Sequence, residues 1–141
     1  MKIYQLLITV LVTIALSSCT RENDDQKNIL MSKTWKRAKA DLNPATNPRG
    51  PILYYAVQNC ETDDTFIFNE DGTLTINRNN DKCSQNEVQN ESQSYSLNRQ
   101  SKVLIIDGTT YTLAEESNQQ IKYYAVVPAT NGFQYLIFLL Q

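Results

Sequence analysis

The chain has 141 residues, with 13 Lys and Arg against 15 Asp and Glu, no His, and a formal net charge of −2. This length suits a single domain, and the slightly acidic balance argues against nucleic acid, which is bound by a basic face. Because His is the commonest general base and the commonest zinc ligand, its absence favours a protein that is not an enzyme and has no metal or cofactor.

The N-terminus carries the pattern of a secretory signal peptide. Lys2 supplies a positive charge, the segment Ile3–Leu16 is almost wholly apolar, and the small residues Ser17 and Ser18 follow. This run is shorter than the roughly 20 residues that a membrane-spanning helix needs. We therefore predict that residues 1–18 are a cleaved signal peptide.

The residues around the expected cleavage point, Leu16-Ser17-Ser18-Cys19, resemble the cleavage box of bacterial lipoproteins. The resemblance implies that Cys19 becomes the first residue of the mature protein and carries the acyl chains that anchor it to a membrane. Several acyl chains bury enough methylene groups for stable attachment. Thr20 follows, where Asp is the inner-membrane retention signal, which implies the outer membrane, facing the periplasm or the cell surface. Residues 19–28 are then a lipidated polar tether.

The rest of the chain predicts one all-β domain over residues 29–141. The candidate strands are rich in Thr, Ile, Val, Tyr and Phe, and several alternate between apolar and polar residues. In chain order they are Thr34–Ala40, Tyr54–Val57, Thr65–Asn69, Thr73–Arg78, Ser92–Leu97, Val103–Asp107, Thr109–Ala114, Ile121–Val127 and Phe133–Leu140. Short strands at this spacing predict an antiparallel meander, closed as a barrel or folded as a sandwich.

Three further features bear on how the strands are arranged. The strand Phe133–Leu140 is apolar on both faces, which favours closure of the sheet by pairing of this last strand with the first. The segment Asp41–Pro51 holds three Pro and excludes a central strand, and Asn79–Asn90 is polar throughout. We expect both of these long loops at the rim, bordering the mouth of any cavity.

Cys60 and Cys83 flank a predicted hairpin and form an even pair for an oxidising compartment. If Gly72 takes the left-handed conformation in a three-residue turn, continuing the register places position 60 within one residue of Cys83. The geometry therefore permits a disulfide at the open end of the hairpin. The alternative, a pair of free thiols in a metal or redox site, lacks both the C-x-x-C spacing and any His.

A second resemblance spans the whole domain. Lys33-Thr34-Trp35 opens the first strand, Cys60 precedes Asp63-Asp64-Thr65-Phe66, Asp71-Gly72-Thr73 forms a hairpin, and Ile105-Ile106-Asp107-Gly108 is followed by Tyr111. This order resembles the lipocalin-like domain lipoproteins of Gram-negative bacteria. The resemblance implies a small antiparallel up-and-down β-barrel of about eight strands.

Aromatic side chains are the candidate ligand-binding groups. Tyr95, Tyr111 and Tyr123 lie on alternating strands and offer apolar rings with polar hydroxyls, and Trp35 lies where it either lines a cavity or plugs one end of a barrel. In strands Tyr and Trp are also ordinary core residues. The expected function is a cell-envelope lipoprotein that binds a small hydrophobic or amphipathic ligand. The alternative is a non-catalytic structural or interaction protein, with a barrel filled by its own side chains and an envelope or host protein as its partner.

Overall fold

The computed structural model describes residues 29–128 and 132–141. The predicted signal peptide (residues 1–18) and the predicted tether (residues 19–28, with Cys19) lie outside these residues. Within them, the chain forms nine strands and two short 3-10 helices. These elements are β1 (Trp35–Lys36), η2 (Pro44–Thr46), β2 (Ile52–Tyr54), η3 (Asn59–Glu61), β3 (Thr65–Phe68), β4 (Thr73–Asn77), β5 (Asn90–Asn98), β6 (Val103–Ile106), β7 (Thr109–Glu116), β8 (Ile121–Val126) and β9 (Tyr135–Leu140).

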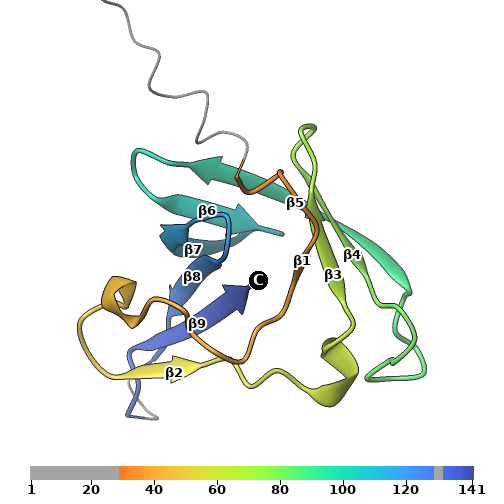
Figure 1. The fold of residues 1–141 in the computed structure, drawn as a ribbon, viewed down its shortest axis with the longest axis horizontal. Helices are drawn as coiled ribbons and strands as arrows, with labels where there is room; N and C mark the ends of the chain where they lie inside the picture. Colours follow the sequence, from red (N-terminus) through yellow and green to blue (C-terminus); the bar gives the residue numbers. More distant parts are fainter. Residues whose placement is uncertain (1–28, 129–131) are drawn as a thin grey trace, which may run out of the picture.

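All nine strands join into one curled sheet in the order β1-β3-β4-β5-β6-β7-β8-β9-β2, which confirms the all-β class (Figure 1). From β3 to β9 each strand pairs antiparallel with the next in sequence, as predicted for a meander. Short turns with Asp71-Gly72 and Asp107-Gly108 join β3 to β4 and β6 to β7, whereas a long polar loop joins β4 to β5.

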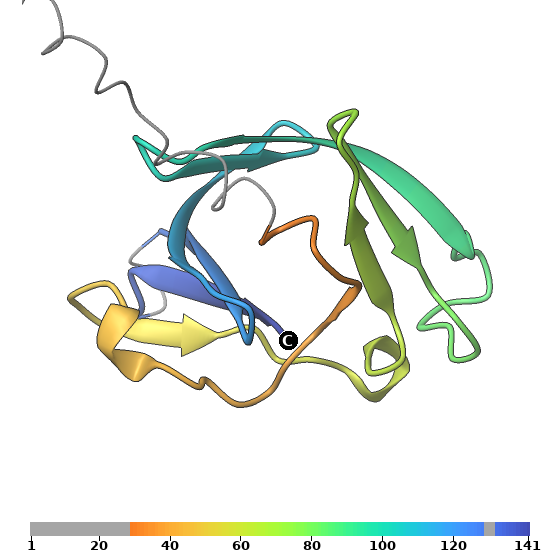
Figure 2. The same cartoon turned by 45° about the horizontal axis from the view of Figure 1, so that its top comes forward.

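The sheet curls at β5, because the two halves of this long strand pair with different neighbours. Its first half, Asn90–Ser94, pairs with β4, and its second half, from Tyr95 onward, pairs with β6. Figure 2 shows the result: β3 and β4 stand on one side of the interior, β7, β8 and β9 stand on the other, and β5 passes between them. The interior of the curl is where inward side chains of both halves meet.

The sheet is a half-barrel, and the expected closed antiparallel barrel of about eight strands is wrong. The reason lies at the outer edge of β9, which is divided between two partners. Its first half, Tyr135–Ile137, pairs in parallel with β2. Its end meets the segment of the first strand through one antiparallel bridge, between Arg37 and Leu140. Three backbone hydrogen bonds accompany it, two between Lys36 and Gln141 at 2.9 Å and one from the Ala38 N–H to the Leu139 carbonyl at 3.1 Å. The expected contact between first and last strands is therefore a single bridge rather than a ladder.

The β3–β4 hairpin has the predicted register. Phe68 pairs with Leu74, and the Asn69 N–H donates to the Thr73 carbonyl at 2.8 Å. Gly72 has φ 81°, the left-handed conformation that the turn requires.

One end of the interior is filled by the protein's own side chains. Trp35 is fully buried there and its indole Nε1 donates to the Leu30 carbonyl at 2.7 Å, so the segment before β1 plugs this end. Phe68 packs edge-on against Tyr95 at 4.9 Å between ring centroids. The other members of this packed end are Leu104, Leu113, Ile121 and Leu140. The residues of this one core run from Leu30 to Leu140.

The loop Asp41–Pro51 lies on the outer face of the sheet, not at the rim as expected. Its anchor is Lys122. Because the neighbouring Tyr123 faces the interior, the Lys122 side chain points to the outer face, where the loop buries it completely. The Lys122 ammonium donates to the Asn43 carbonyl at 2.6 Å and pairs with Asp41 at 2.9 Å. A buried cation needs such partners, because removing it from water is costly.

The Asp41–Lys122 pair makes a prediction for acid stability. Burial by itself raises the pKa of Asp41, but hydrogen bonds from Lys122, the Asn43 backbone, Tyr54 and Gln120 outweigh it and lower the pKa from 3.8 to about 2. The pair thus stabilises the fold above about pH 4 and loses its effect as the pH falls toward 2. Across this window, urea titrations should show the free energy of unfolding of the wild type falling about 2 kcal/mol more than that of Asp41→Asn. The exposed Asp81→Asn is the control, and equal pH slopes for Asp41→Asn and wild type would contradict the assignment.

Candidate functional site

The end of the interior that Trp35 does not fill holds a cavity of about 210 Å³. Inward positions of the strands from β3 to β9 contribute to its walls, because alternate residues of each strand face the inside of the curl. Its lining consists of Arg37, Glu61, Asp64, Phe66, Leu74, Ile76, Arg78, Gln93, Ile106, Tyr111, Tyr123 and Phe138. This lining combines an apolar wall with a small number of charged groups, which is typical of a site for a small molecule.

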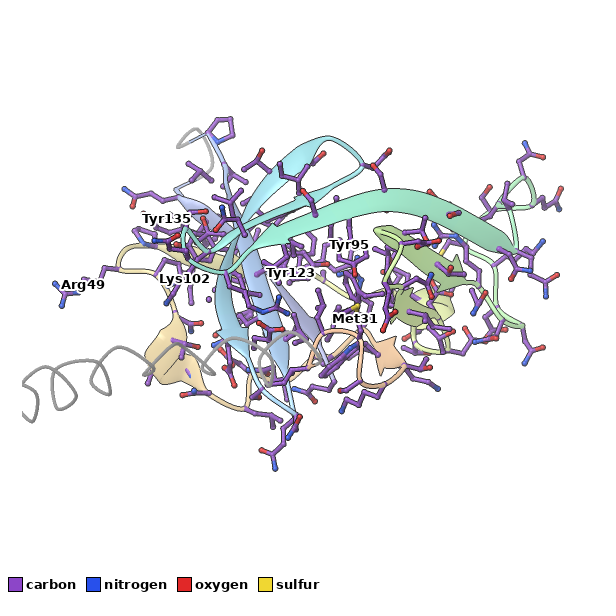
Figure 3. All side chains as sticks on the ribbon, turned by 90° about the horizontal axis from the view of Figure 1, so that it is seen from above. Met31, Arg49, Tyr95, Lys102, Tyr123 and Tyr135 are labelled. Atoms are coloured by element: carbon purple, nitrogen blue, oxygen red, sulfur yellow. A yellow bond between two sulfur atoms is a disulfide. The ribbon has the colours of Figure 1, made fainter. Side chains whose placement is uncertain are left out.

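Aromatic rings make up one wall of the cavity. Tyr123 stacks on Phe138 with ring centroids 5.2 Å apart, and Tyr111 meets Tyr123 edge-on at 5.2 Å. Tyr55, in the segment after β2, stacks on the same Phe138 at 5.1 Å. Such contacts hold the rings in fixed orientations, so the wall is preformed. Figure 3 shows the labelled Tyr123 toward the middle of the molecule, whereas the labelled Arg49 lies at its periphery.

A cluster of ion pairs, formed by one Arg and three carboxylates, lies where β3 begins and β4 ends. The Arg78 guanidinium contacts Asp64 at 3.2 Å, Glu87 at 3.1 Å and Glu91 at 2.8 Å. Asp64 is only 2% exposed, and burial raises the pKa of its carboxyl while the Arg78 charge opposes that shift. Arg78 therefore compensates the buried carboxylate that lines this part of the cavity.

Arg37 is held differently from Arg78. It follows Trp35 by two residues, so it projects to the same side of the chain, and its Nη1 donates to the Tyr123 hydroxyl at 2.9 Å. Its guanidinium lies over the ring of Phe66 at 4.6 Å and over that of Tyr55 at 5.2 Å. These are cation–π distances, and they fix the guanidinium against the aromatic wall.

Glu61, in η3, forms its hydrogen bonds with neutral groups. Its Oε1 accepts from the Tyr55 hydroxyl at 2.7 Å and its Oε2 accepts from the Gln58 backbone N–H at 2.8 Å. Burial raises the pKa of the Tyr55 hydroxyl, and its hydrogen bond to Glu61 acts in the same direction. Tyr55 is therefore neutral and donates to the carboxylate.

The structure brings together two of the four aromatic residues predicted to bind a ligand. Tyr111 and Tyr123 both line the cavity. Trp35 lies in the packed end, in the plugging position that the sequence left open. Tyr95 lines a separate, more open hollow of about 220 Å³ next to Leu30, and its hydroxyl donates to the Asn69 carbonyl at 2.7 Å.

The charged groups of the cavity were missed in the sequence, although the strand period contains them. Asp64 stands two residues before Phe66 in the inward row of β3, and Arg78 stands two residues after Ile76 in that of β4. Arg37 likewise shares the inward row of Trp35. The alternation of inward and outward residues therefore indicated that these charged side chains face the interior. The usual location of charged side chains at the surface argued against that interpretation.

The predicted disulfide between Cys60 and Cys83 is confirmed, with the two Cα atoms 5.2 Å apart. It joins η3, which carries Glu61, to the polar loop after β4. In the same region Asp63 accepts from the backbone N–H of Asn80 at 2.8 Å, so this carboxylate caps the loop. The disulfide and this cap together fix the chain on both sides of the charged end of the cavity.

The described part of the chain contains no group of three Cys, Asp or Glu side chains placed to hold a metal ion. Residues 29–128 and 132–141 include no helix with the length and apolar character to cross a membrane. No protein-family model, curated protein or solved structure matches this chain.

The disulfide gives a stability prediction. Cys60→Ala/Cys83→Ala should lose about 2–4 kcal/mol of unfolding free energy, because the cross-link constrains a loop of 23 residues in the unfolded chain. Denaturant unfolding measures the loss, and reduction of the wild type with dithiothreitol should reproduce it. Non-reducing peptide mapping of protein made in an oxidising compartment should show the two peptides joined. Alkylation of both thiols there without reductant would contradict the pairing.

Proposed function

We propose that this chain is a cell-envelope lipoprotein of the bacterial outer membrane that binds a small apolar or amphipathic molecule inside its curled sheet, without catalysing a reaction. The observation that carries the binding function is the 210 Å³ cavity with its preformed aromatic wall. Binding of an apolar ligand to these rings costs little conformational entropy, because the rings already hold one another in fixed positions.

The size of the cavity restricts the ligand. At about 30 Å³ per water molecule, this volume holds about seven waters, below the roughly 300–1,000 Å³ of drug-sized sites. Sterols and tetrapyrroles are therefore too large to be enclosed. A short acyl chain or a single substituted ring fits the space.

The lipoprotein part of the proposal rests on the N-terminal sequence and on the disulfide. Lys2, the apolar run Ile3–Leu16 and the box ending at Cys19 supply the signal and the acylation site. The Cys60–Cys83 bond suits an oxidising compartment outside the cytoplasm. The polar residues 19–28 would be the tether between the lipid anchor and the sheet.

A second candidate function is a non-catalytic protein that acts through its loops on an envelope or host protein. The packed end favours it, because Trp35, Leu104 and Ile121 have no exposed surface and fill much of the interior. The interior of a barrel of about eight strands is just wide enough to be filled by side chains, and this curled sheet is of similar size. The two candidate functions differ in whether the remaining cavity binds a ligand.

The anchor is tested by Cys19→Ala, which removes the thiol that the acyl chain would occupy. We expect the precursor to stay uncleaved and to incorporate no labelled palmitate in a Gram-negative host, because processing follows acylation in lipoproteins. Ser18→Ala, which keeps a small residue beside the intact Cys, is the control and should be processed normally. Recovery of acylated, cleaved protein from Cys19→Ala would refute the lipoprotein proposal.

The ligand site is tested with three probes that share an eight-carbon tail, 1-octanol, octanoate and octylamine, on the segment Thr20–Gln141. At ten times its dissociation constant, a bound probe should stabilise the fold by about 1.4 kcal/mol and raise the melting temperature by roughly 5 °C. Ile106→Phe, which adds a ring to the cavity, should abolish the shift. Ile105→Phe, on the opposite face of the same strand, should leave it unchanged.

The outcome decides between the two candidate functions. A saturable shift that Ile106→Phe removes and Ile105→Phe retains supports ligand binding in the cavity. No shift with any of the three probes would instead favour the interaction protein.

A further inference from the structure

We infer that Arg37 is the anion-binding residue of this cavity and that the ligand is a small monocarboxylate with a short apolar tail. This inference rests on the proposed ligand site and names the chemistry of what the site takes. It depends on the contacts of Arg37, on the neighbouring acids, and on the aromatic wall.

Arg37 has a charge that the protein does not pair. None of the ion pairs in the described part of the chain involves it, whereas Arg78, the other Arg of the cavity, has three carboxylate partners. Its Nε is buried and has no hydrogen-bond partner. A guanidinium has five N–H donors, and the Tyr123 hydroxyl accepts from only one nitrogen. The remaining donors suit a planar acceptor with two oxygens.

The surroundings of Arg37 explain how the cation is retained without a carboxylate. Phe66, Tyr55 and Phe138 present ring faces to the guanidinium at 4.6, 5.2 and 5.4 Å. These contacts offset part of the cost of desolvation, but rings do not accept the in-plane N–H groups. An anion at the edge of the guanidinium would supply the missing acceptors.

The same rings place the rest of the ligand. Phe66 and Phe138 contact Arg37 and also line the cavity, which continues along Tyr111, Ile76 and Ile106. A molecule whose head meets Arg37 therefore has its tail against apolar side chains. The ligand must be amphipathic, with the charge at one end.

The neighbouring acids restrict the charge of the head group. Glu61 and Asp64 line the same cavity, Glu61 bonded to Tyr55 and Gln58, Asp64 to Arg78. A monoanion beside Arg37 meets these two carboxylates with a single negative charge, whereas a phosphate head brings close to two. The balance of the lining therefore favours a carboxylate over a phosphate.

The test compares octanoate with 1-octanol and octylamine on wild type and on Arg37→Gln, by calorimetric titration of the segment Thr20–Gln141. On the wild type, octanoate should bind more tightly than either probe. Arg37→Gln should weaken octanoate about tenfold or more, because a hydrogen bond to a charged group is lost, and should change 1-octanol less than twofold. Lys36→Gln removes the same charge from the adjacent, exposed residue of β1 and should leave all three affinities unchanged.

Tyr123→Phe keeps the ring and removes the hydroxyl that orients Arg37, so it should weaken octanoate selectively and by less than Arg37→Gln does. It also provides a second variant if Arg37→Gln does not fold, and the comparison of the three probes on the wild type needs no variant. Equal binding of octanoate and 1-octanol, or equal weakening of both by Arg37→Gln, would overturn the role of Arg37 and leave the proposed cavity standing. Binding of no probe would overturn the cavity itself.

Discussion

The divided edge of β9 is the constraint from which the rest of the architecture follows. Its first half accepts β2 in parallel, and its end accepts the residues just after β1. The chain must therefore travel from one half of this edge to the other between residues 38 and 52. It does so over the outer face of the sheet, where the buried Lys122 holds it through Asp41 and Asn43. The same arrangement turns β1 into the interior, carrying Trp35 to the packed end and Arg37 to the cavity.

The two ends of the interior thus differ in how their side chains are held. At one end, large apolar side chains are packed to complete burial around Trp35, and this end holds the two halves of the curl together. At the other end the side chains are partly polar, and aromatic contacts rather than close filling fix their positions. The disulfide and the Arg78 ion pairs stand beside this end.

The sequence predicted the strands from β3 to β9 well because alternation and turn residues are local signals. The first two were less well predicted, since Thr34–Ala40 is a strand only at Trp35–Lys36 and the expected Tyr54–Val57 is replaced by Ile52–Tyr54. The register of the β3–β4 hairpin and the disulfide followed from one such turn at Gly72. The closed barrel was wrong because the direction and partner of a three-residue strand such as β2 are decided by contacts distant in sequence, which no local pattern records. For the cavity, Tyr111 and Tyr123 were predicted by their aromatic character, whereas Arg37 was not. Its inward orientation was implied by its spacing from Trp35, but only the neighbouring rings from β3 and β9 make that position tolerable for a cation.

The length of β2 has a consequence for how copies of the protein meet one another. A sheet ends in strands whose backbone groups are free to pair with another chain, and long flat edges lead to aggregation. Here the terminal strand beyond β9 has only three residues and follows directly on Pro51, which has no N–H to donate. A neighbouring molecule therefore finds little backbone at this edge with which to extend the sheet.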